Sequence, residues 1–267
     1  MSTVWKAAIG RYPHTAALLE GRVASDLLRL ECTDFPNITR AFAPMVRELR
    51  FDVSEMAIAT YLQAKKHGKA LELLPVVLSA RLQEGSLFCR ADGPIRGPAD
   101  LVGKRVGVRA YSQTTGLWLR GILQDSYGVA ADGMRWTTFE DAHVAEASDP
   151  PWAERAPAGS DMAAMLRDGA LDAAIFGSDA PKMDWAQPVF PDVAEAGRGF
   201  IARHGFVPVN HLMVVRADRA EPTLVAELLR MVAASDEAAP SGLPRGWDAL
   251  EAPLALAKRY ATEQGLI

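Results

Sequence analysis

The chain has 267 residues, which is enough for one large domain or for two lobes of roughly 130 residues each. Hydrophobic residues make up 49% of the sequence and charged residues 23%, as is typical of a soluble globular protein. The net charge is −4 and no Lys/Arg cluster occurs, which argues against a nucleic-acid partner. No apolar run approaches the roughly 18 residues that a membrane helix requires, so no membrane association is expected.

Segments with strand-like and helix-like patterns alternate along the chain. Strands are predicted at residues 4–9, 28–32, 53–59, 73–78, 86–90, 105–108, 134–137, 173–176 and 209–216. Helices are predicted at residues 14–20, 37–49, 60–67, 116–127, 161–168, 192–204, 222–235 and 251–264. This alternation predicts the α/β class, in which helix-then-strand units build parallel sheets.

One helix–turn–strand pattern occurs in each half of the chain. MVRELRFDV (45–53) aligns without gaps with MLRDGALDA (165–173), and this alignment pairs Asp52 with Asp172. Convergence of such joints on similar sequences is an alternative explanation. The occurrence of one copy in each half favours a protein with two lobes.

A segment at residues 103–129, GKRVGVRAYSQTTGLWLRGILQDSYGV, combines a buried strand, a loop with hydroxyl side chains and a helix. The hydroxyl side chains belong to Ser112, Thr114 and Thr115, and the helix is expected to begin at about Gly116. Unpaired N–H groups at a helix start, beside hydroxyl donors, suit an anion such as a carboxylate. The glycine patterns of phosphate loops and dinucleotide sites are missing, so a small carboxylated molecule is expected rather than a nucleotide.

Polar residues follow several predicted strands. In open α/β sheets, ligands bind beyond the carboxyl ends of the strands. The residues that this rule selects are Arg11, Tyr12, His14, Ser54, Glu55, Arg81, Arg109, Ser178 and Asp179. For Ser54 and Glu55, a place within the strand itself is the alternative. Because an arginine donates two parallel hydrogen bonds to a carboxylate, Arg11 and Arg81 are candidate ligands in the first lobe. For each of them, a solvated surface arginine is the alternative.

Two residues are candidates for proton transfer. His211 lies in the predicted strand VPVNHLMVV, and a histidine there could pass a proton near neutral pH. The alternative for His211 is a buried, hydrogen-bonded histidine in an apolar layer. Glu55 could act as an acid or base beside an apolar wall, and its alternatives are a solvated carboxylate or an ion pair with an arginine.

A long segment at residues 141–161 has neither a helical nor a strand period and is rich in Pro and Ala. Loops of this length in a domain are functional or disordered. Trp152 could cap a ligand cleft, or it could pack on its own lobe.

No cofactor is predicted, because no spacing of His, Asp, Glu or Cys indicates a metal site, although scattered ligands of a divalent metal could meet in a cleft. Cys32 and Cys89 are isolated and are expected to be free thiols. The segment MSTVWKAAIGRYPH lacks a basic stretch followed by an apolar core, so a cytoplasmic protein is expected. A homo-oligomer is left open.

Strings along most of the chain resemble 4,5-dihydroxyphthalate decarboxylases, which are similar in fold to type II periplasmic solute-binding proteins. The strings are AAIGRYPHTAALLEGRV (7–23), FDVSEMAIATYL (51–62), LPVVLSARL (74–82), Tyr111-x-x-Thr114-x-x-x-Trp118-x-Arg120-Gly121-Ile122-Leu123, DMAAMLRDGALDAAI (161–175) and VFPDVAEAGRGFIARHGFVPVNHLMVVR (189–216). The resemblance implies an interlobe ligand cleft, with residues 1–90 and 205–267 in lobe one and 91–204 in lobe two. It also implies that the strings at 86–91 and 206–216 are crossing strands.

The resemblance implies a decarboxylase for a small hydroxylated aromatic carboxylic acid. In this interpretation His211 protonates the ring carbon that loses its carboxylate. Arg81 and the Ser112–Thr115 segment hold a retained carboxylate. Tyr111 and Asn210, which lie in matching strings, are expected beside the substrate.

The chain departs from the family at two places. The family carries Arg-His-Ser where this chain has Glu84-Gly85-Ser86, so two cations are missing and Glu84 is expected to repel a second substrate carboxylate. Arg11 and Pro13 also stand where acidic residues are usual. A non-catalytic solute-binding protein and a different lyase on the same fold are therefore the alternatives.

Overall fold

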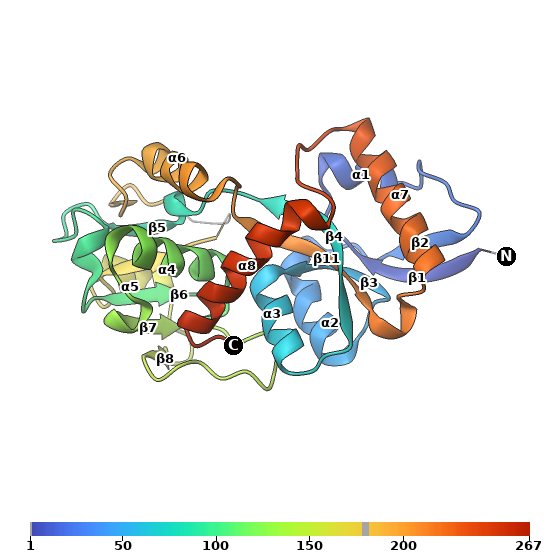
Figure 1. The fold of residues 1–267 in the computed structure, drawn as a ribbon. Coiled ribbons are helices and arrows are strands. Elements are labelled where there is room, and N and C mark those ends of the chain that lie inside the picture. The colour runs from blue at the N-terminus through green and yellow to red at the C-terminus, as the bar shows by residue number, and fades with distance from the viewer. Residues whose placement is uncertain (1, 178–181) are drawn as a thin grey trace. The chain divides into compact units, whose positions relative to one another are not determined.

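Two separate β-sheets organise the chain (Figure 1). The computed structural model describes residues 2–177 and 182–267. Unit 1 comprises Met1–Ala80 and Val209–Glu251, and unit 2 comprises Arg81–Pro208 and Ala252–Ile267. Helices and strands alternate in both units, so the predicted α/β class is confirmed.

The unit boundaries differ from the expected ones. The chain leaves unit 1 after Ala80 rather than near residue 90, and it returns at Val209 rather than near 205. The reason is that β4 and β11 remain paired in unit 1 as far as these two residues. The final segment, residues 252–267, belongs to unit 2 and not to the first lobe as expected.

The two predicted crossing strands each belong to one sheet. β5 (Leu87–Arg90) pairs with β9 and β10 in unit 2. β11 (Val209–Arg216) pairs with β3 and β4 in unit 1. Residues 86–91 thus lie wholly in unit 2, which contradicts the prediction for the first string, whereas the second string, 206–216, contains the unit boundary between Pro208 and Val209.

The sheet of unit 1 has the strand order β2-β1-β3-β11-β4. Strands β1, β2 and β3 are parallel, and β11 runs antiparallel to both of its neighbours. Helices α1 and α7 cover one face of this sheet, and α2 and α3 cover the other (Figure 1). The bounds are β1 Thr3–Ala8, β2 Leu28–Cys32, β3 Val53–Ala57, β4 Leu71–Ala80, α1 Pro13–Leu19, α2 Phe42–Glu48, α3 Ile58–Lys66 and α7 Pro222–Ala238.

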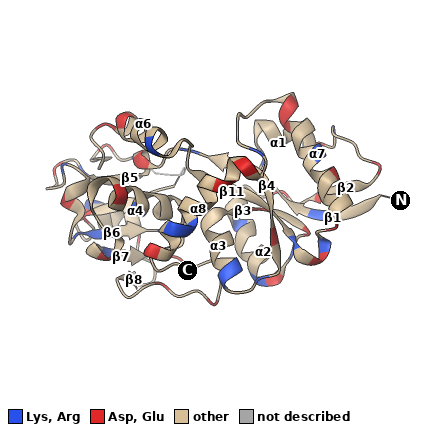
Figure 2. Ribbon diagram, in the orientation of Figure 1, with Lys and Arg blue, Asp and Glu red and all other residues tan. Residues whose placement is uncertain are grey.

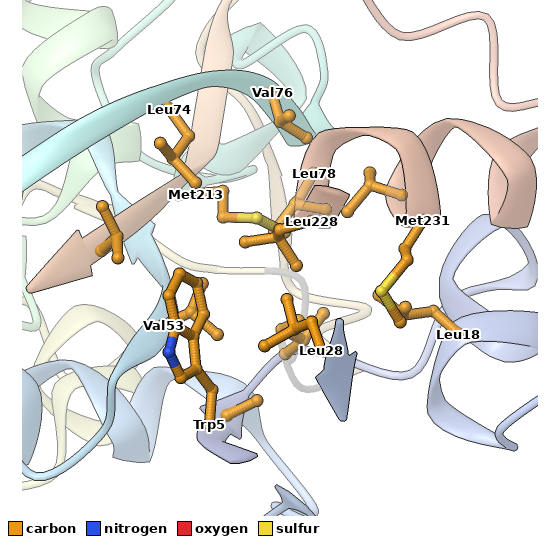
Figure 3. Packing of buried hydrophobic residues seen from close by; sticks show 14 residues of the cluster. Trp5, Leu18, Leu28, Val53, Leu74, Val76, Leu78, Met213, Leu228 and Met231 are labelled. Carbon is orange, nitrogen blue, oxygen red and sulfur yellow. The ribbon is translucent and has the colours of Figure 1, made fainter. Parts of the chain in front are cut away.

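The core of unit 1 fills the space between the sheet and helices α1 and α7 (Figure 3). Trp5, Val53 and Met213 project from three neighbouring strands, and Leu228 and Met231 of α7 pack on them. Burial of each such side chain contributes about 1.5–3 kcal/mol, so this layer holds the strand ends in place. The ends of β1 and β3 carry the polar residues described below.

The sheet of unit 2 has the strand order β10-β5-β9-β6-β7-β8. Its three-residue strands β8 and β10 were not predicted, because they lie in short segments without a period-two pattern. The bounds are β6 Arg105–Val108, β7 Arg135–Thr138, β8 Ala153–Arg155, β9 Ala173–Ile175, β10 Ala186–Pro188, α4 Thr114–Tyr127, α5 Met162–Arg167, α6 Val193–His204 and α8 Trp247–Glu263, the last beginning in unit 1. Single 3-10 turns occur at Ile38–Ala41, Glu84–Ser86, Pro98–Leu101, Ala131–Gly133 and Ala217–Arg219.

Helices α4 and α5 cover opposite faces of the second sheet. A Cβ at Gly107 of β6 would lie 2.6 Å from Leu171 and 3.1 Å from Met162 of α5. The next residue, Val108, contacts the position of Gly116 in α4. Because successive strand residues face opposite sides, the two helices lie on opposite faces. Helix α4 begins at Thr114, two residues before the predicted start.

The internal sequence repeat corresponds to a repeated contact. The carboxylate of Asp52 accepts the N–H of Lys6 in β1 at 2.8 Å, and the N–H of Asp52 donates to the Lys6 carbonyl. In unit 2, Asp172 makes the same two bonds with Arg105 of β6, where the carboxylate bond is 2.9 Å long. Each aspartate therefore ties the start of its strand to the neighbouring parallel strand.

Basic and acidic residues are interspersed along the helices and loops of both units (Figure 2). Exposed ion pairs such as Arg29–Glu31 and Arg50–Glu48 join neighbours in the sequence. Exposed pairs of this kind contribute about 0–1 kcal/mol each, so the stability of the fold depends mainly on the buried cores.

Candidate active site

A buried carboxylate lies at the centre of the polar residues of unit 1. Glu55 of β3 is 0% exposed. Its Oε2 accepts the N–H of Gly10 at 2.8 Å, and its Oε1 accepts the hydroxyl of Tyr12 at 2.7 Å. Oε1 also lies 2.6 Å from Nδ1 of His211. Three polar partners therefore compensate the burial of this acceptor-only group.

The loop after β1 has a local reason for its shape. A Cβ at Gly10 would lie 2.7 Å from the Tyr12 ring and 2.8 Å from Glu55 Oε2, so only glycine fits here. Thr15 Oγ1 accepts the N–H of Tyr12 at 2.9 Å and donates to the Gly10 carbonyl at 2.6 Å. Thr15 thus positions the loop that contacts Glu55.

His211 has one nitrogen bound to a carboxylate and a partly exposed ring. Its side chain is 17% exposed and packs edge-to-face on Phe42 at 5.1 Å between ring centroids. With Nδ1 directed at Glu55, the other nitrogen, Nε2, is the one left for a ligand. The alternative interpretation was a buried, hydrogen-bonded histidine in an apolar layer. His211 is hydrogen-bonded, but its side chain is partly exposed.

Strand β11 is irregular where it carries His211. Its register with β4 shifts between Val209 and Met213, whereas its register with β3 is continuous. Pro75 of β4 lies in the shifted region and cannot donate a ladder hydrogen bond. The continuous pairing with β3, in which Met213 faces Glu55 and His211 faces Ala57, places His211 on the same face of the sheet as Glu55.

Two aromatic residues of the loop after β1 adjoin this pair. The rings of Tyr12 and His14 stack with centroids 5.1 Å apart and planes 5° from parallel. Burial, and then the Glu55 carboxylate, raise the pKa of Tyr12, so its hydroxyl stays a donor. Burial lowers the pKa of His14, an effect that Asp236 opposes. Tyr12 was predicted to bind substrate, but its hydroxyl contacts Glu55.

A second polar cluster lies in unit 2. Nη1 of Arg81 donates to Ser86 Oγ at 3.0 Å, and Nη2 donates to Thr115 Oγ1 at 2.9 Å. These bonds orient the guanidinium beside the first turn of α4. Ser86 was not among the predicted ligand residues, although it coincides with the serine of the family's Arg-His-Ser string.

The start of α4 has the character of an anion site. Ser112, Thr114 and Thr115 are only 5%, 5% and 3% exposed. The N-cap residue, Gln113, makes no side-chain capping bond. The positive end of the helix dipole and the guanidinium of Arg81 therefore both favour an anion in this part of unit 2.

Two predicted ligand residues have other roles. Arg11 is 58% exposed and pairs with Glu20 at 3.5 Å, so it is a surface arginine. Tyr111 is fully buried, donates its hydroxyl proton to the Gln264 carbonyl at 3.1 Å and accepts from Trp152 at 2.8 Å. Tyr111 and Trp152 thus pack within unit 2, which corrects the substrate-binding prediction for Tyr111.

The remaining candidates are placed as follows. Asn210 is buried next to His211 in β11. Ser54 belongs to β3 itself, and its hydroxyl donates to the Glu55 carbonyl at 2.7 Å. Arg109 pairs with Glu140 at 3.6 Å. Ser178 and Asp179 lie outside the described residues.

Glu84 is not positioned as an exposed negative charge. It is 0% exposed, and its Oε2 accepts the N–H of Gln83 at 2.9 Å. Burial raises the pKa of Glu84, which favours the uncharged form. The repulsion of a second substrate carboxylate, expected from the sequence, is correspondingly weaker.

Neither a metal site nor a membrane helix is found in the described part of the chain. Within residues 2–177 and 182–267, no group of three or more His, Cys, Asp or Glu side chains could hold a metal ion. No helix over the same ranges is long and apolar enough to cross a membrane. Cys32 and Cys89 are both free thiols.

Comparison with curated proteins confirms the sequence resemblance. No protein-family model matches the chain. The 4,5-dihydroxyphthalate decarboxylase of Comamonas testosteroni is 29% identical over 231 residues, which cover 80% of this chain and 68% of that protein. The protein of the same name from Pseudomonas putida is 28% identical over 186 residues, which cover 65% of this chain and 70% of that protein.

Comparison with solved structures shows the fold. Protein AF1704 from Archaeoglobus fulgidus has a TM-score of 0.58 at 15% identity, over 99% of this chain and 98% of that chain. The periplasmic aliphatic sulphonate binding protein SsuA from Escherichia coli has a TM-score of 0.54 at 16% identity, over 100% of this chain and 80% of that chain. The chain is thus a distant homologue of 4,5-dihydroxyphthalate decarboxylases with the two-sheet, two-lobe α/β fold of SsuA-type periplasmic binding proteins.

Proposed function

We propose that the protein is a decarboxylase acting on a small hydroxylated aromatic carboxylic acid. The observation that carries this proposal is the His211–Glu55 pair, whose 2.6 Å contact leaves Nε2 of a partly exposed histidine for a ligand. The distant homology to 4,5-dihydroxyphthalate decarboxylases supports the reaction type.

The reaction requires one proton and no redox partner. In a ring with a hydroxyl group para to the carboxylate, the hydroxyl oxygen donates electron density to the carbon that bears the carboxylate. Protonated His211 transfers its Nε2 proton to that carbon, and the bond to the carboxylate then breaks. CO2 leaves, the electron pair of the broken bond restores the aromatic ring, and His211 recovers a proton from solvent.

Glu55 has a supporting role in this scheme. Its carboxylate orients the imidazole ring of His211 through the contact with Nδ1. Tyr12 and Gly10 hold the carboxylate in turn. A proton donor oriented in this way is ready before the substrate arrives.

The cluster in unit 2 supports a carboxylate-bearing substrate. Arg81 is held by Ser86 and Thr115 next to the start of α4, and both the cation and the helix end favour an anion. The family's Arg-His pair is replaced by Glu84-Gly85, and Glu84 is buried. We therefore expect a substrate with fewer carboxylates than a phthalate.

A non-catalytic solute-binding protein is the second candidate. The observation that favours it is the fold shared with SsuA, a sulphonate binding protein. In that case the same residues hold a ligand without transferring a proton. A different lyase reaction on the same fold is the third possibility, because function depends on the site rather than on the fold.

One experiment separates these candidates. The purified protein is incubated with 4,5-dihydroxyphthalate and with mono- and dihydroxybenzoates, and CO2 release and calorimetric binding are measured in parallel. CO2 release that is lost in His211→Asn and retained in His67→Asn supports the proposal. Binding of an acid without CO2 release favours the solute-binding protein, and no binding of any acid contradicts both.

A further inference from the structure

Arg120 is a buried cation that forms no ion pair with a carboxylate in the described part of the chain. It lies in α4 and is 0% exposed. Nε donates to Gln264 Oε1 at 2.7 Å, and Nη2 donates to the Tyr111 carbonyl at 2.7 Å. Its guanidinium carbon lies 3.9 Å from the centre of the Tyr111 ring. Within the described residues, no acidic side chain lies within ion-pair distance of Arg120, and Nη1 has no hydrogen-bond partner.

The unpaired nitrogen is directed at the first turn of α4. A Cβ at Gly116 would lie 2.9 Å from Nη1 of Arg120. The side chain therefore runs back along the helix by one turn, to the level of the buried hydroxyl residues at the helix start. A Cβ at position 116 would displace this end of the guanidinium.

Such an arrangement is costly unless an anion compensates it. A buried charge that lacks a counter-ion is among the most unfavourable features of a protein interior. Burial lowers the pKa of Arg120, in line with this cost, and the charge of Asp149 only partly opposes the effect. The buried, uncapped start of α4 adds a second positive pole at the same place.

We propose that Arg120 is a positioning residue that selects anionic ligands at the start of α4 without touching them. Its charge lies beneath the first turn and adds to the attraction that the helix end and Arg81 exert on a carboxylate. The inference rests on the proposed function for the identity of that anion as an aromatic carboxylate. Arg120 thus contributes to the preference of this site for anionic over neutral ligands.

Gln264, near the C-terminal end of the described chain, holds Arg120 in place. Gln264 is 1% exposed, and its Nε2 donates to the Leu117 carbonyl at 2.9 Å while its Oε1 accepts from Arg120. The carbonyl of Gln264 accepts the hydroxyl of Tyr111. Gln264 thus holds both the guanidinium and the residue over which it stacks.

The test changes the charge at Arg120 while keeping its shape. Gln264→Glu places a carboxylate against Nε, which neutralises the cation, and loses the hydrogen bond to the Leu117 carbonyl. Gln264→Leu loses both side-chain hydrogen bonds of Gln264 and leaves the cation uncompensated. Calorimetry measures the affinities for 3,4-dihydroxybenzoate and for the neutral 3,4-dihydroxybenzamide. We expect the acid-to-amide affinity ratio to fall about tenfold in Gln264→Glu, the effect of one unit charge about 10 Å away at an effective dielectric of about 20.

The control variant should keep the ratio of the unaltered protein. If Arg120 has a purely structural role, the acid-to-amide affinity ratio is unchanged in Gln264→Glu or falls equally in both variants. Either result overturns the inference. Thermal melting of both variants verifies that they are folded, and Arg120→Lys, which keeps the charge, should preserve the ratio if it folds. Binding of the acid without CO2 release contradicts the proposed function alone, whereas no acid binding by the unaltered protein contradicts both.

Discussion

Glu55 Oε1 lies 2.6 Å from His211 Nδ1, although the two residues are separated by 156 positions in the sequence. They meet because β3 and β11 are antiparallel neighbours in which Glu55 faces Met213 and Ala57 faces His211. Diagonal neighbours on one face of a sheet are within reach of long side chains. The carboxylate–imidazole pair is therefore a product of the sheet register and not of a local motif.

The first prediction concerns the proton donor. His211→Asn keeps a hydrogen-bonding side chain next to Glu55 but cannot transfer a proton. We expect turnover of an identified substrate to fall by roughly 10²–10⁴ while the dissociation constant changes little. Steady-state rates and calorimetric affinities measure the two effects, with His67→Asn as the matched control. Undiminished turnover would remove His211 from the mechanism.

The second prediction concerns Tyr12, which donates to the same oxygen that His211 contacts. Tyr12→Phe keeps the ring stacked on His14 and deletes one hydrogen bond to a buried carboxylate. We expect a loss of about 1–3 kcal/mol in the free energy of unfolding. We also expect turnover to fall, because Tyr12 no longer helps to hold the Glu55 carboxylate that orients His211. Denaturant unfolding and steady-state rates verify these effects, and a stable variant with unchanged turnover would contradict the assigned role of Tyr12.

The sequence predicted the helices and strands better than the side-chain contacts between distant residues. The period-two strand at His211 and the hydroxyl loop at Thr114 were recognisable locally, and both were found. The partners of Tyr12 and Arg120 were not, because Glu55 and Gln264 lie 43 and 144 positions away. The lobe boundary was also missed, since it depends on where β4 and β11 stop pairing.

The third prediction concerns the glycine after β1. Gly10→Ala introduces a Cβ only 2.7 Å from the Tyr12 ring and 2.8 Å from Glu55 Oε2, so one of these groups must move. We expect a destabilisation of about 1–3 kcal/mol together with reduced turnover. Gly133→Ala is the control, because nothing lies within 4 Å of its Cβ position. If Gly10→Ala melts like the control, the packing around Glu55 is looser than described.

The fourth prediction concerns the cluster in unit 2. Thr115→Val removes the acceptor for Arg81 Nη2 at 2.9 Å and leaves the shape of the side chain nearly unchanged. We expect carboxylate binding to weaken by about 1–3 kcal/mol, as is typical for the loss of one hydrogen bond to a charged group. Calorimetry with the same hydroxybenzoate in Thr115→Val and in the exposed control Thr262→Val measures the effect. Equal affinities in the two variants would exclude the Arg81–Thr115 pair from binding.

The last prediction concerns Glu84 and pH. Burial raises the pKa of this carboxyl group in the folded protein, so folding favours its protonated form. A raised acid pKa penalises the folded state at pH values above the folded-state pKa. The penalty is absent below the unfolded value of about 4.3. Glu84→Gln keeps an oxygen for the Gln83 N–H and has no charge to bury.

We therefore expect Glu84→Gln to be more stable than the unaltered protein at pH 7, by about 1 kcal/mol for each unit of pKa shift. The advantage should shrink as the pH falls and vanish below about pH 4. Urea unfolding at a series of pH values measures the difference, with the exposed Glu140→Gln as control. An advantage that persists at low pH would mean that the amide stabilises through new hydrogen bonds. A loss of stability at neutral pH would mean that Glu84 has an ionic partner in the folded protein.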